Sequence, residues 1–203
     1  MKLDINSFNP QKLRDFCKRE GKKVRYHKGE QIEQEGYPAK WFAFVEKGYF
    51  KYVKRDAIDD KEHIFWFSSE GDFLADYPAC LYGQPALTTI EAMSSSHVYR
   101  VSREQLMMFF RQDMESMELR SVIGEYMLHQ LTERYLSFYF STSLKRYQLL
   151  QERYPDIVKR TSIKDIASLF NITPKTISLI RHEIIETAPS KPIMTSITHM
   201  KAA

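Results

Sequence analysis

Cysteine is scarce in this 203-residue chain, which contains only Cys17 and Cys80. Two cysteines are too few for the disulfide framework of a secreted domain, a four-cysteine zinc site or an iron–sulfur cluster. No apolar run approaches the roughly 18 residues that a membrane span requires, and the first residues, MKLDINSFNPQKL, lack the apolar core of a signal peptide. The sequence therefore predicts a cytoplasmic protein with two reduced, buried thiols and no membrane partner.

A strong excess of one charge is also missing. The chain has 30 Lys and Arg against 26 Asp and Glu, and its content of 43% apolar and 28% charged residues is typical of a folded globular protein. The positive excess is uneven, because residues 1–140 have a net charge of −1 and residues 141–203 one of +5. A basic C-terminal third favours an anionic partner at that end of the chain.

Glycine is limited to seven residues, and five of them separate short segments rich in aromatic and β-branched residues between Lys22 and Val101. These segments, such as WFAFVEKGYFKYVKR and EHIFWFSS, predict many short strands in a closed sandwich or barrel rather than a parallel sheet. Within them, FVEKGYFKY predicts a hairpin that turns at Lys47-Gly48. Ahead of the strands, Asn9 as a cap and Pro10 as the first helical residue predict a short helix over 10–19.

Helix is expected again from Ser102, because SREQ has the spacing of a capping box. The longest helix should run from Asp113 to about Phe140, with apolar residues in two stripes that require burial on more than one side. One side can cover the strands and the other can pack against a second subunit, while burial within one large core is the alternative. We predict a homodimer in which this helix contributes Leu119, Ile123, Tyr126 and Leu131.

Beyond Ser141 the sequence predicts short helices, the first over 143–154 and ended by Pro155. The segment TSIKDIASLFNITPKTISLIRHEI then predicts a helix over 162–170 and a second helix over 174–185. Asn171 tolerates the left-handed conformation of a tight turn, Thr173 can cap the second helix, and a proline at its first position has no N–H to lose. From Thr187 the chain has little periodicity and predicts a partly unstructured tail.

Two short helices joined by a tight turn form a helix-turn-helix, whose second helix enters the major groove of double-stranded DNA. The alternative is a plain corner of two helices with a solvated outer face. Spacing and capping favour DNA binding, with phosphates and base edges contacted by the residues expected on the outer face. These residues are Thr173, Lys175, Thr176, Ser178, Leu179, Arg181 and His182.

The order of these parts resembles the Crp/Fnr superfamily of bacterial transcription regulators. DIASLFNITPKTISLIR looks like the family's DNA-binding signature, GDF matches a glycine motif of its β-domain, and LKRYQLLQERYP is similar to a helix of Bacteroidetes-type members. The resemblance implies an α+β fold and a transcription regulator rather than an enzyme, with RNA polymerase as a further candidate partner. Its parts would be a cyclic-nucleotide-binding-type β-roll (jelly roll) in 1–112, a dimerisation helix in 113–140, a winged helix-turn-helix in 141–186 and a tail in 187–203.

The cassette that binds the cyclic phosphate in this family is degenerate here. Its members place Arg-Ser or Arg-Thr after a Gly-Glu-Leu motif, whereas this chain has Ala86-Leu87 at that position and no Lys or Arg between Gly71 and Met93. Because an unpaired phosphate is costly to bury, cyclic AMP is not expected as the effector, and no cofactor is expected. The candidate pocket could hold a less polar ligand or none. Its residues are Gly71, Asp72, Phe73, Ala86, Leu87 and Thr88.

The recognition helix also departs from the family, because Leu179 stands where members often place a guanine-reading arginine. Either the operator differs, with Lys175 reading guanine and Leu179 a thymine methyl, or binding is mostly electrostatic. Three further functions are compatible with the sequence: a ligand- or protein-binding module with degenerate DNA binding, a haem sensor ligated by Cys80 or His97, and a cupin-type enzyme. The haem sensor and the cupin would need paired metal ligands that the sequence lacks, so no metal is expected.

Overall fold

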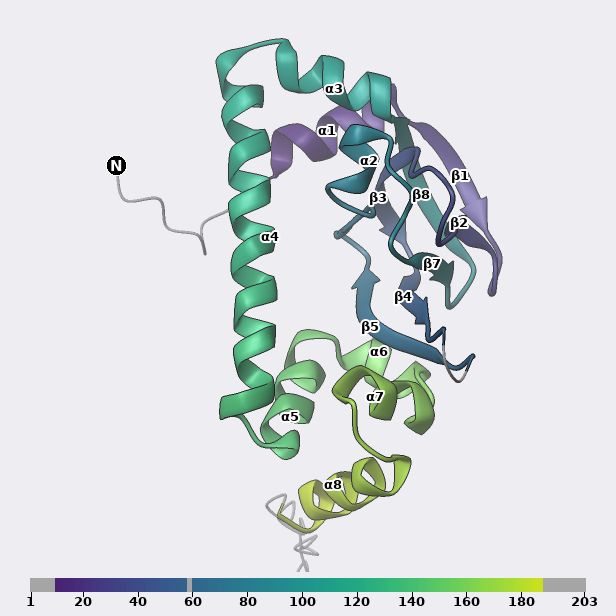
Figure 1. The fold of residues 1–203 in the computed structure, drawn as a ribbon, viewed down its shortest axis with the longest axis vertical. Coiled ribbons are helices and arrows are strands. Elements are labelled where there is room, and N and C mark those ends of the chain that lie inside the picture. The colour runs from purple at the N-terminus through teal and green to yellow at the C-terminus, as the bar shows by residue number, and fades with distance from the viewer. Residues whose placement is uncertain (1–9, 58–59, 188–203) are drawn as a thin grey trace, which may run out of the picture.

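The computed structural model describes residues 10–57 and 60–187. A long helix, α4, runs along one side of the molecule, with the strands beside its N-terminal half and the last four helices around its C-terminal end (Figure 1). The strand-containing part consists of α1 Gln11–Glu20, β1 Lys22–Tyr26, β2 Gln31–Glu33, β3 Trp41–Lys47, β4 Tyr49–Arg55, β5 Glu62–Ser69, β6 Phe73–Leu74, α2 Ala79–Tyr82, β7 Thr89–Ala92, β8 Ser96–Ser102 and α3 Arg103–Arg111. The helical part consists of α4 Met114–Phe140, α5 Ser143–Arg153, α6 Pro155–Arg160, α7 Ile163–Phe170 and α8 Pro174–Thr187.

The eight strands, here called the β-roll, form two antiparallel four-stranded sheets, in the orders β1-β8-β3-β6 and β2-β7-β4-β5. The expected sandwich of antiparallel strands is confirmed, but its closure is wrong, since the sheets remain two open layers. The expected hairpin at Lys47-Gly48 is also wrong, because β3 and β4 belong to different sheets and β4 pairs instead with β5 and β7. Gly48 has a φ of 109°, and a Cβ there would lie 2.1 Å from the Ser96 hydroxyl oxygen. Only glycine permits this close crossing between the layers.

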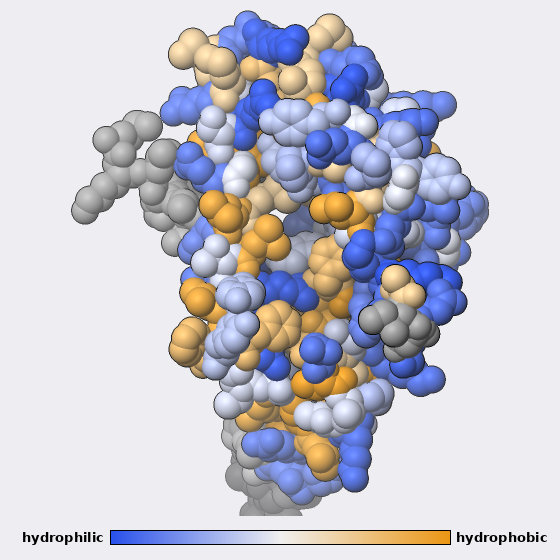
Figure 2. Space-filling model, viewed as in Figure 1, coloured by the Kyte–Doolittle hydropathy of each residue, from blue (hydrophilic) through white to orange (hydrophobic). Residues whose placement is uncertain are grey.

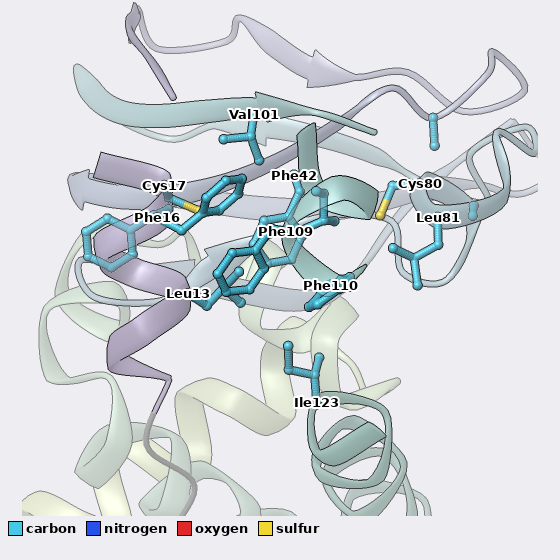
Figure 3. Packing of buried hydrophobic residues seen from close by; sticks show 14 of the residues in the cluster. Leu13, Phe16, Cys17, Phe42, Cys80, Leu81, Val101, Phe109, Phe110 and Ile123 are labelled. Atoms are coloured by element: carbon cyan, nitrogen blue, oxygen red, sulfur yellow. The ribbon is translucent and has the colours of Figure 1, made fainter. Parts of the chain in front are cut away.

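The largest core cluster lies between the β-roll and the helices that cover it. Phe16 and Cys17 of α1, Phe109 and Phe110 of α3 and Ile123 of α4 converge there (Figure 3). Cys17 and Cys80 are free and buried, as predicted, and burial raises the pKa of both thiols to about 12.

Local helix signals are confirmed where they lie inside the described residues. The Ser102 hydroxyl accepts from the backbone N–H of Gln105, whose side chain accepts from the Ser102 N–H. Asp113 caps α4, and Lys12 bridges Asp113 and Glu115 at 2.9 and 2.6 Å, which ties α1 to the start of α4. The first helix begins at Gln11, one residue later than expected, while Asn9 and the predicted tail beyond Thr187 lie outside the described residues.

Pro155 ends one helix and begins another. The expected stop of α5 is confirmed at Arg153, but the six-residue helix α6, with Pro155 in its first turn, was not predicted. The physical reason is the one that applies at Pro174: proline has the φ of a first helical turn and lacks only an N–H that would have no partner there. Residues 141–187 contain only helices, so the strands of the expected wing are not found in this described segment.

Candidate DNA-binding helix and effector pocket

Helices α7 and α8, here called the helix-turn-helix module, are joined by the predicted tight turn. The Ser162 hydroxyl caps α7 by accepting from the Asp165 N–H at 3.1 Å. Asn171 ends it with φ 52° and ψ 48°, in the left-handed region, and the Ile172 N–H then donates to the Ala167 carbonyl at 3.0 Å. Ala167 is only 1% exposed, so its small side chain allows the close approach of the two helices.

The second helix is capped as predicted and presents an open outer face. The Thr173 hydroxyl accepts from the Thr176 N–H at 3.2 Å. Ile177 and Ile180 are buried on the inner face. Four of the predicted DNA-contacting residues are exposed along the helix, and Leu179 is 61% exposed. The exposed four are Lys175, Ser178, Leu179 and His182, with Thr173 exposed at the cap and Thr176 half-buried.

The residues of the candidate effector pocket in the β-roll have two different environments, one around Asp72 and one around Thr88. Asp72 accepts from the Ser69 N–H at 2.8 Å, and burial raises the pKa of the Asp72 carboxyl. Thr88 is buried, and both its N–H and its hydroxyl donate to the same oxygen of Asp76 at 2.9 Å. The donors at Thr88 are therefore already used by an internal carboxylate.

The remaining pocket residues do not supply a positive charge. Ala86 is buried, and Leu87 is 63% exposed with its carbonyl accepting from Lys54, which is itself paired with Glu35. Glu33 is buried near Asp76 and accepts from the backbone N–H groups of Lys40 and Trp41. Burial, opposed by those hydrogen bonds, raises the pKa of Glu33. The surroundings of Thr88 thus contain two acidic side chains, with Arg100 of β8 as a nearby cation that interacts with Glu33.

These sites lie in a chain whose parts match known proteins. Residues 23–113 match the family model of the cyclic nucleotide-binding domain. The whole structure is similar to that of FixK2 from Bradyrhizobium japonicum, with a TM-score of 0.67, 20% identity and coverage of 82% of this chain and 85% of that one. It is also similar to a transcriptional regulator of the CRP/FNR family from Thermus thermophilus, with a TM-score of 0.64, 13% identity and coverage of 82% and 87%. The chain has the Crp/Fnr fold.

The same likeness extends to a CooA variant from Carboxydothermus hydrogenoformans, with a TM-score of 0.62, 15% identity and coverage of 89% of this chain and 85% of that one. None of the curated proteins matches this chain in sequence. At these identities the likeness concerns the Crp/Fnr fold, and the residues that set specificity have to be judged from this chain alone.

Within this Crp/Fnr fold, Arg181 is half-buried and bonded to neighbouring helices. Its Nε donates to the Tyr147 hydroxyl at 2.9 Å and its guanidinium lies over that ring, while Nη2 reaches the Val158 carbonyl at 3.5 Å. The sequence predicted that Arg181 lies on the outer face of α8. Its position in the helical pattern could not show that α5 and α6 flank this edge of the helix. Arg181 therefore positions α8 against its neighbours.

The helix-turn-helix module also shares a core with the β-roll, which the sequence did not indicate. Ile166 and Phe170 of α7 belong to one cluster with Val53 of β4 and Phe67 of β5. The Ser168 hydroxyl accepts from the Ile64 N–H at 2.9 Å. The module is thus packed directly on the sheet that carries β4 and β5.

The predicted dimerisation residues divide between two faces of α4. Ile123 is 6% exposed and, with Leu119, packs in the core cluster against the β-roll within the same chain. Tyr126 is half-buried, whereas Leu131 is 56% exposed. The uncovered face contains further residues that the prediction omitted, including Leu128 and Tyr135, which are 66% and 61% exposed.

Metal and membrane sites find no support in the described part of the chain. No group of three or more His, Cys, Asp or Glu side chains in residues 10–57 and 60–187 is placed to hold a metal ion. Cys80 packs among apolar side chains, and its raised pKa disfavours the thiolate that a haem iron would require. None of the described helices has both the length and the apolar character needed to span a bilayer.

Proposed function

We propose that the chain is a homodimeric, DNA-binding transcription regulator whose β-roll does not respond to cyclic AMP. The observation that supports DNA binding is the state of α8: it is capped by Thr173, anchored by Ile177 and Ile180, and exposed along Lys175, Ser178 and Leu179. A helix held in this way presents its N-terminal turn and a line of side chains to a major groove. The net charge of +5 in residues 141–203 adds attraction to phosphates.

The proposed dimer rests on the uncovered face of α4. Residues on this face alternate at spacings of four and three, which is the pattern of a two-helix coiled-coil seam. They are Met117, Ser121, Gly124, Leu128, Leu131 and Tyr135, and the apolar members among them are 50–66% exposed in the single chain. Exposed apolar side chains at these positions are unfavourable in water, and the small Ser121 and Gly124 between them allow a second helix to approach closely, so the face favours pairing with a second copy.

The oligomeric state can be measured by light scattering or sedimentation. A Leu131→Glu substitution should convert the dimer to a monomer because it places a charge in the seam. Thr132→Glu adds the same charge one residue outside the seam, and should leave the dimer intact. A wild-type chain that is monomeric at micromolar concentration would contradict the proposed dimer.

Selection of bound sequences from random duplex DNA tests the proposed function. A dimer should select pseudo-palindromic sites with half-sites about 34–36 Å apart, and binding should weaken steeply with salt. Binding to the selected site that is no stronger than to random DNA at moderate salt would remove the support for specific regulation.

The proposed lack of response to cyclic AMP is supported by the acidic surroundings of Thr88. A cyclic phosphate there would meet Asp76 and Glu33, and no arginine follows in the cassette. Repeating the DNA selection with micromolar cyclic AMP should therefore change nothing. Stronger binding with the nucleotide would show that the cassette residues are misassigned.

A second candidate function is a ligand- or protein-binding module with degenerate DNA binding. The exposed Leu179 and the internally bound Arg181 favour it, because both weaken the usual donor set of α8. Both functions predict a stable dimer, and only the first predicts a selected DNA sequence. RNA polymerase remains a candidate partner of the first function only.

A further inference from the structure

A cavity of about 500 Å³ lies where the β-roll, α4, α5 and α7 meet. Its wall includes Trp66 from β5, Arg134 and Phe138 from α4, Arg146 from α5 and Phe170 from α7. We call it the junction cavity. Figure 2 shows a hollow in the surface between the middle of α4 and the β-roll, whereas the junction cavity lies nearer the C-terminal end of α4, where its lining residues 130–141 are. The cavity is distinct from the cassette and from the outer face of α8.

Arg134 brings a half-buried positive charge to this cavity, and no carboxylate of the described residues is paired with it. Its Nη2 donates to the Leu169 carbonyl at 3.2 Å, and its guanidinium lies 5.5 Å from the Trp66 ring and 5.9 Å from the Phe138 ring. Burial alone lowers the pKa of Arg134 to about 10. A guanidinium in such surroundings is normally balanced by an acid, and none of the described residues forms an ion pair with it.

Arg146 faces the same cavity from the opposite helix. Its guanidinium lies 4.9 Å from the Phe138 ring, and its Nη atoms donate to the Ser137 carbonyl and the Ser143 hydroxyl. Its Nε is buried and has no hydrogen-bond partner in the described structure. Burial lowers the pKa of Arg146 as well. Two guanidinium groups beside one aromatic ring, neither of them in an ion pair with a described residue, make this part of the cavity positive.

The rest of the wall determines what kind of anion fits. Trp66, Phe138 and Phe170 provide flat apolar surface, and the volume is within the range of ordinary small-molecule sites, about 300–1,000 Å³. Glu133, the acidic residue of the wall, lies on an exposed position of α4, and Arg153 is already bonded to Gln130 at 2.7 Å. The aromatic surface would be left largely bare by a simple inorganic ion.

We propose that the junction cavity binds a small organic anion, a carboxylate, sulfonate or phosphate carried on an aromatic body, with Arg134 and Arg146 holding the charge. Such a ligand supplies the missing negative charge and covers the aromatic wall. Because Arg134 already bonds the last turn of α7, the ligand contacts the β-roll and the helix-turn-helix module at once. Its effect on DNA affinity rests on the proposed function, whereas its binding does not.

The binding test uses the full chain and two dyes of the same shape. 1-Anilinonaphthalene-8-sulfonate has an aromatic body with one negative charge, and N-phenyl-1-naphthylamine is its uncharged parent. Fluorescence titration should show one sulfonate dye per chain, bound at least about tenfold more tightly than the parent, as expected for a charge-assisted contact. In a Trp41→Phe background Trp66 is the single tryptophan, and its emission should be quenched by energy transfer to the bound dye.

Substitutions locate the charge. Arg146→Gln should reduce sulfonate-dye affinity to about that of the neutral parent, and Arg146→Lys should restore part of the difference. Arg19→Gln removes the same charge from an exposed position on α1 and should change nothing. Equal affinity for the two dyes on the wild-type chain would overturn the proposal whether or not the Arg146 variants fold. An unchanged dye preference in a folded Arg146→Gln chain, or an unquenched Trp66, would overturn it too.

A final measurement separates this inference from the proposed function. The affinity of the chain for its selected duplex is measured with and without saturating sulfonate dye, and a change of severalfold is expected. Dye binding with unchanged DNA affinity would overturn the coupling and leave the site established. Failure of DNA selection with tight, arginine-dependent dye binding would contradict the regulator and support the site.

Discussion

The cassette of the β-roll and the outer face of α8 treat their polar groups in opposite ways. Around the cassette, the carboxylate of Asp76 receives both donors of Thr88, and Glu33 receives two backbone N–H groups. On α8, Lys175 and Leu179 are exposed on a helix that Thr173 caps and Ile177 anchors, while the Ser178 hydroxyl donates within the helix to the Pro174 carbonyl at 3.1 Å. The polar groups around the cassette are satisfied by internal partners, whereas the exposed side chains of α8 remain available to a ligand. The same Crp/Fnr fold thus contains a self-satisfied site and an open one.

The largest effect should come from the core that joins the two regions. Ile166 is fully buried in the cluster shared by α7 and β5, so Ile166→Ala should lower the free energy of unfolding by about 2–5 kcal/mol. Because the core spans both regions, chemical denaturation should still show one transition. Ile185→Ala, at a 74% exposed position of α8, is the control and should cost less than about 0.5 kcal/mol. Two separate transitions would show that the regions are independent.

The next effect concerns the internal carboxylate of the cassette. Asp76→Ala leaves the Thr88 N–H and hydroxyl without their acceptor in a buried position, and should cost about 1–3 kcal/mol of stability. Glu118→Ala, at an exposed position of α4, should be nearly neutral in the same denaturation experiment. A neutral Asp76→Ala would mean that the cassette is not satisfied from within, and the contrast with α8 would fail.

The open site is tested by Lys175. Lys175→Ala should lower affinity for the selected duplex by roughly tenfold, because a base contact from lysine is worth about 1–3 kcal/mol, and it should relax the preferred sequence. Lys145→Ala removes the same charge from an exposed position of α5 and should weaken all sequences slightly and equally. An unchanged preference in Lys175→Ala would remove this residue from the reading surface.

The smallest effect is a pH dependence of stability that comes from Glu33 beside the cassette. Burial raises the pKa of Glu33 above the value of 4.5 for a free side chain, so the unfolded state holds fewer protons than the folded state in the window between the two values. The stabilisation from this group is present below pH 4.5 and is lost as the pH rises through the folded pKa. Glu33→Gln should therefore remove a component of stability that decreases as the pH rises above 4.5. Parallel pH profiles for the two chains would contradict the buried, ionisable Glu33.

Sequence reasoning succeeded where the deciding interactions are local. The capping box at Ser102, the left-handed Asn171 and the cap at Thr173 each join residues within a few positions, so residue type and spacing were sufficient. The start of α4 after Asp113 was predicted for the same reason.

It failed where distant segments decide. The Lys47-Gly48 segment has hairpin chemistry, but β3 pairs with β8 and β4 pairs with β7. These partner strands are about 50–60 and about 40 residues away along the chain. Asp76 was overlooked although one acid in an apolar segment was a usable signal, because its partner Thr88 lies twelve residues on. Arg134 and Arg146 gave no signal at all, since arginines on helices are usually solvated.

The long helix α4 connects the β-roll mechanically to the helix-turn-helix module. Its 27 residues form an uninterrupted rod of about 40 Å at 1.5 Å per residue, held by Ile123 in the core of the β-roll and by Arg134 at the end of α7. From Ile123 to the C-terminal end of α4 is about 25 Å, so a tilt of about 8° at Ile123 displaces that end by roughly 3.5 Å, which is close to the rise of one base pair. A tilt too small to repack the core around Ile123 thus moves the C-terminal end of α4 by about the spacing of one base pair.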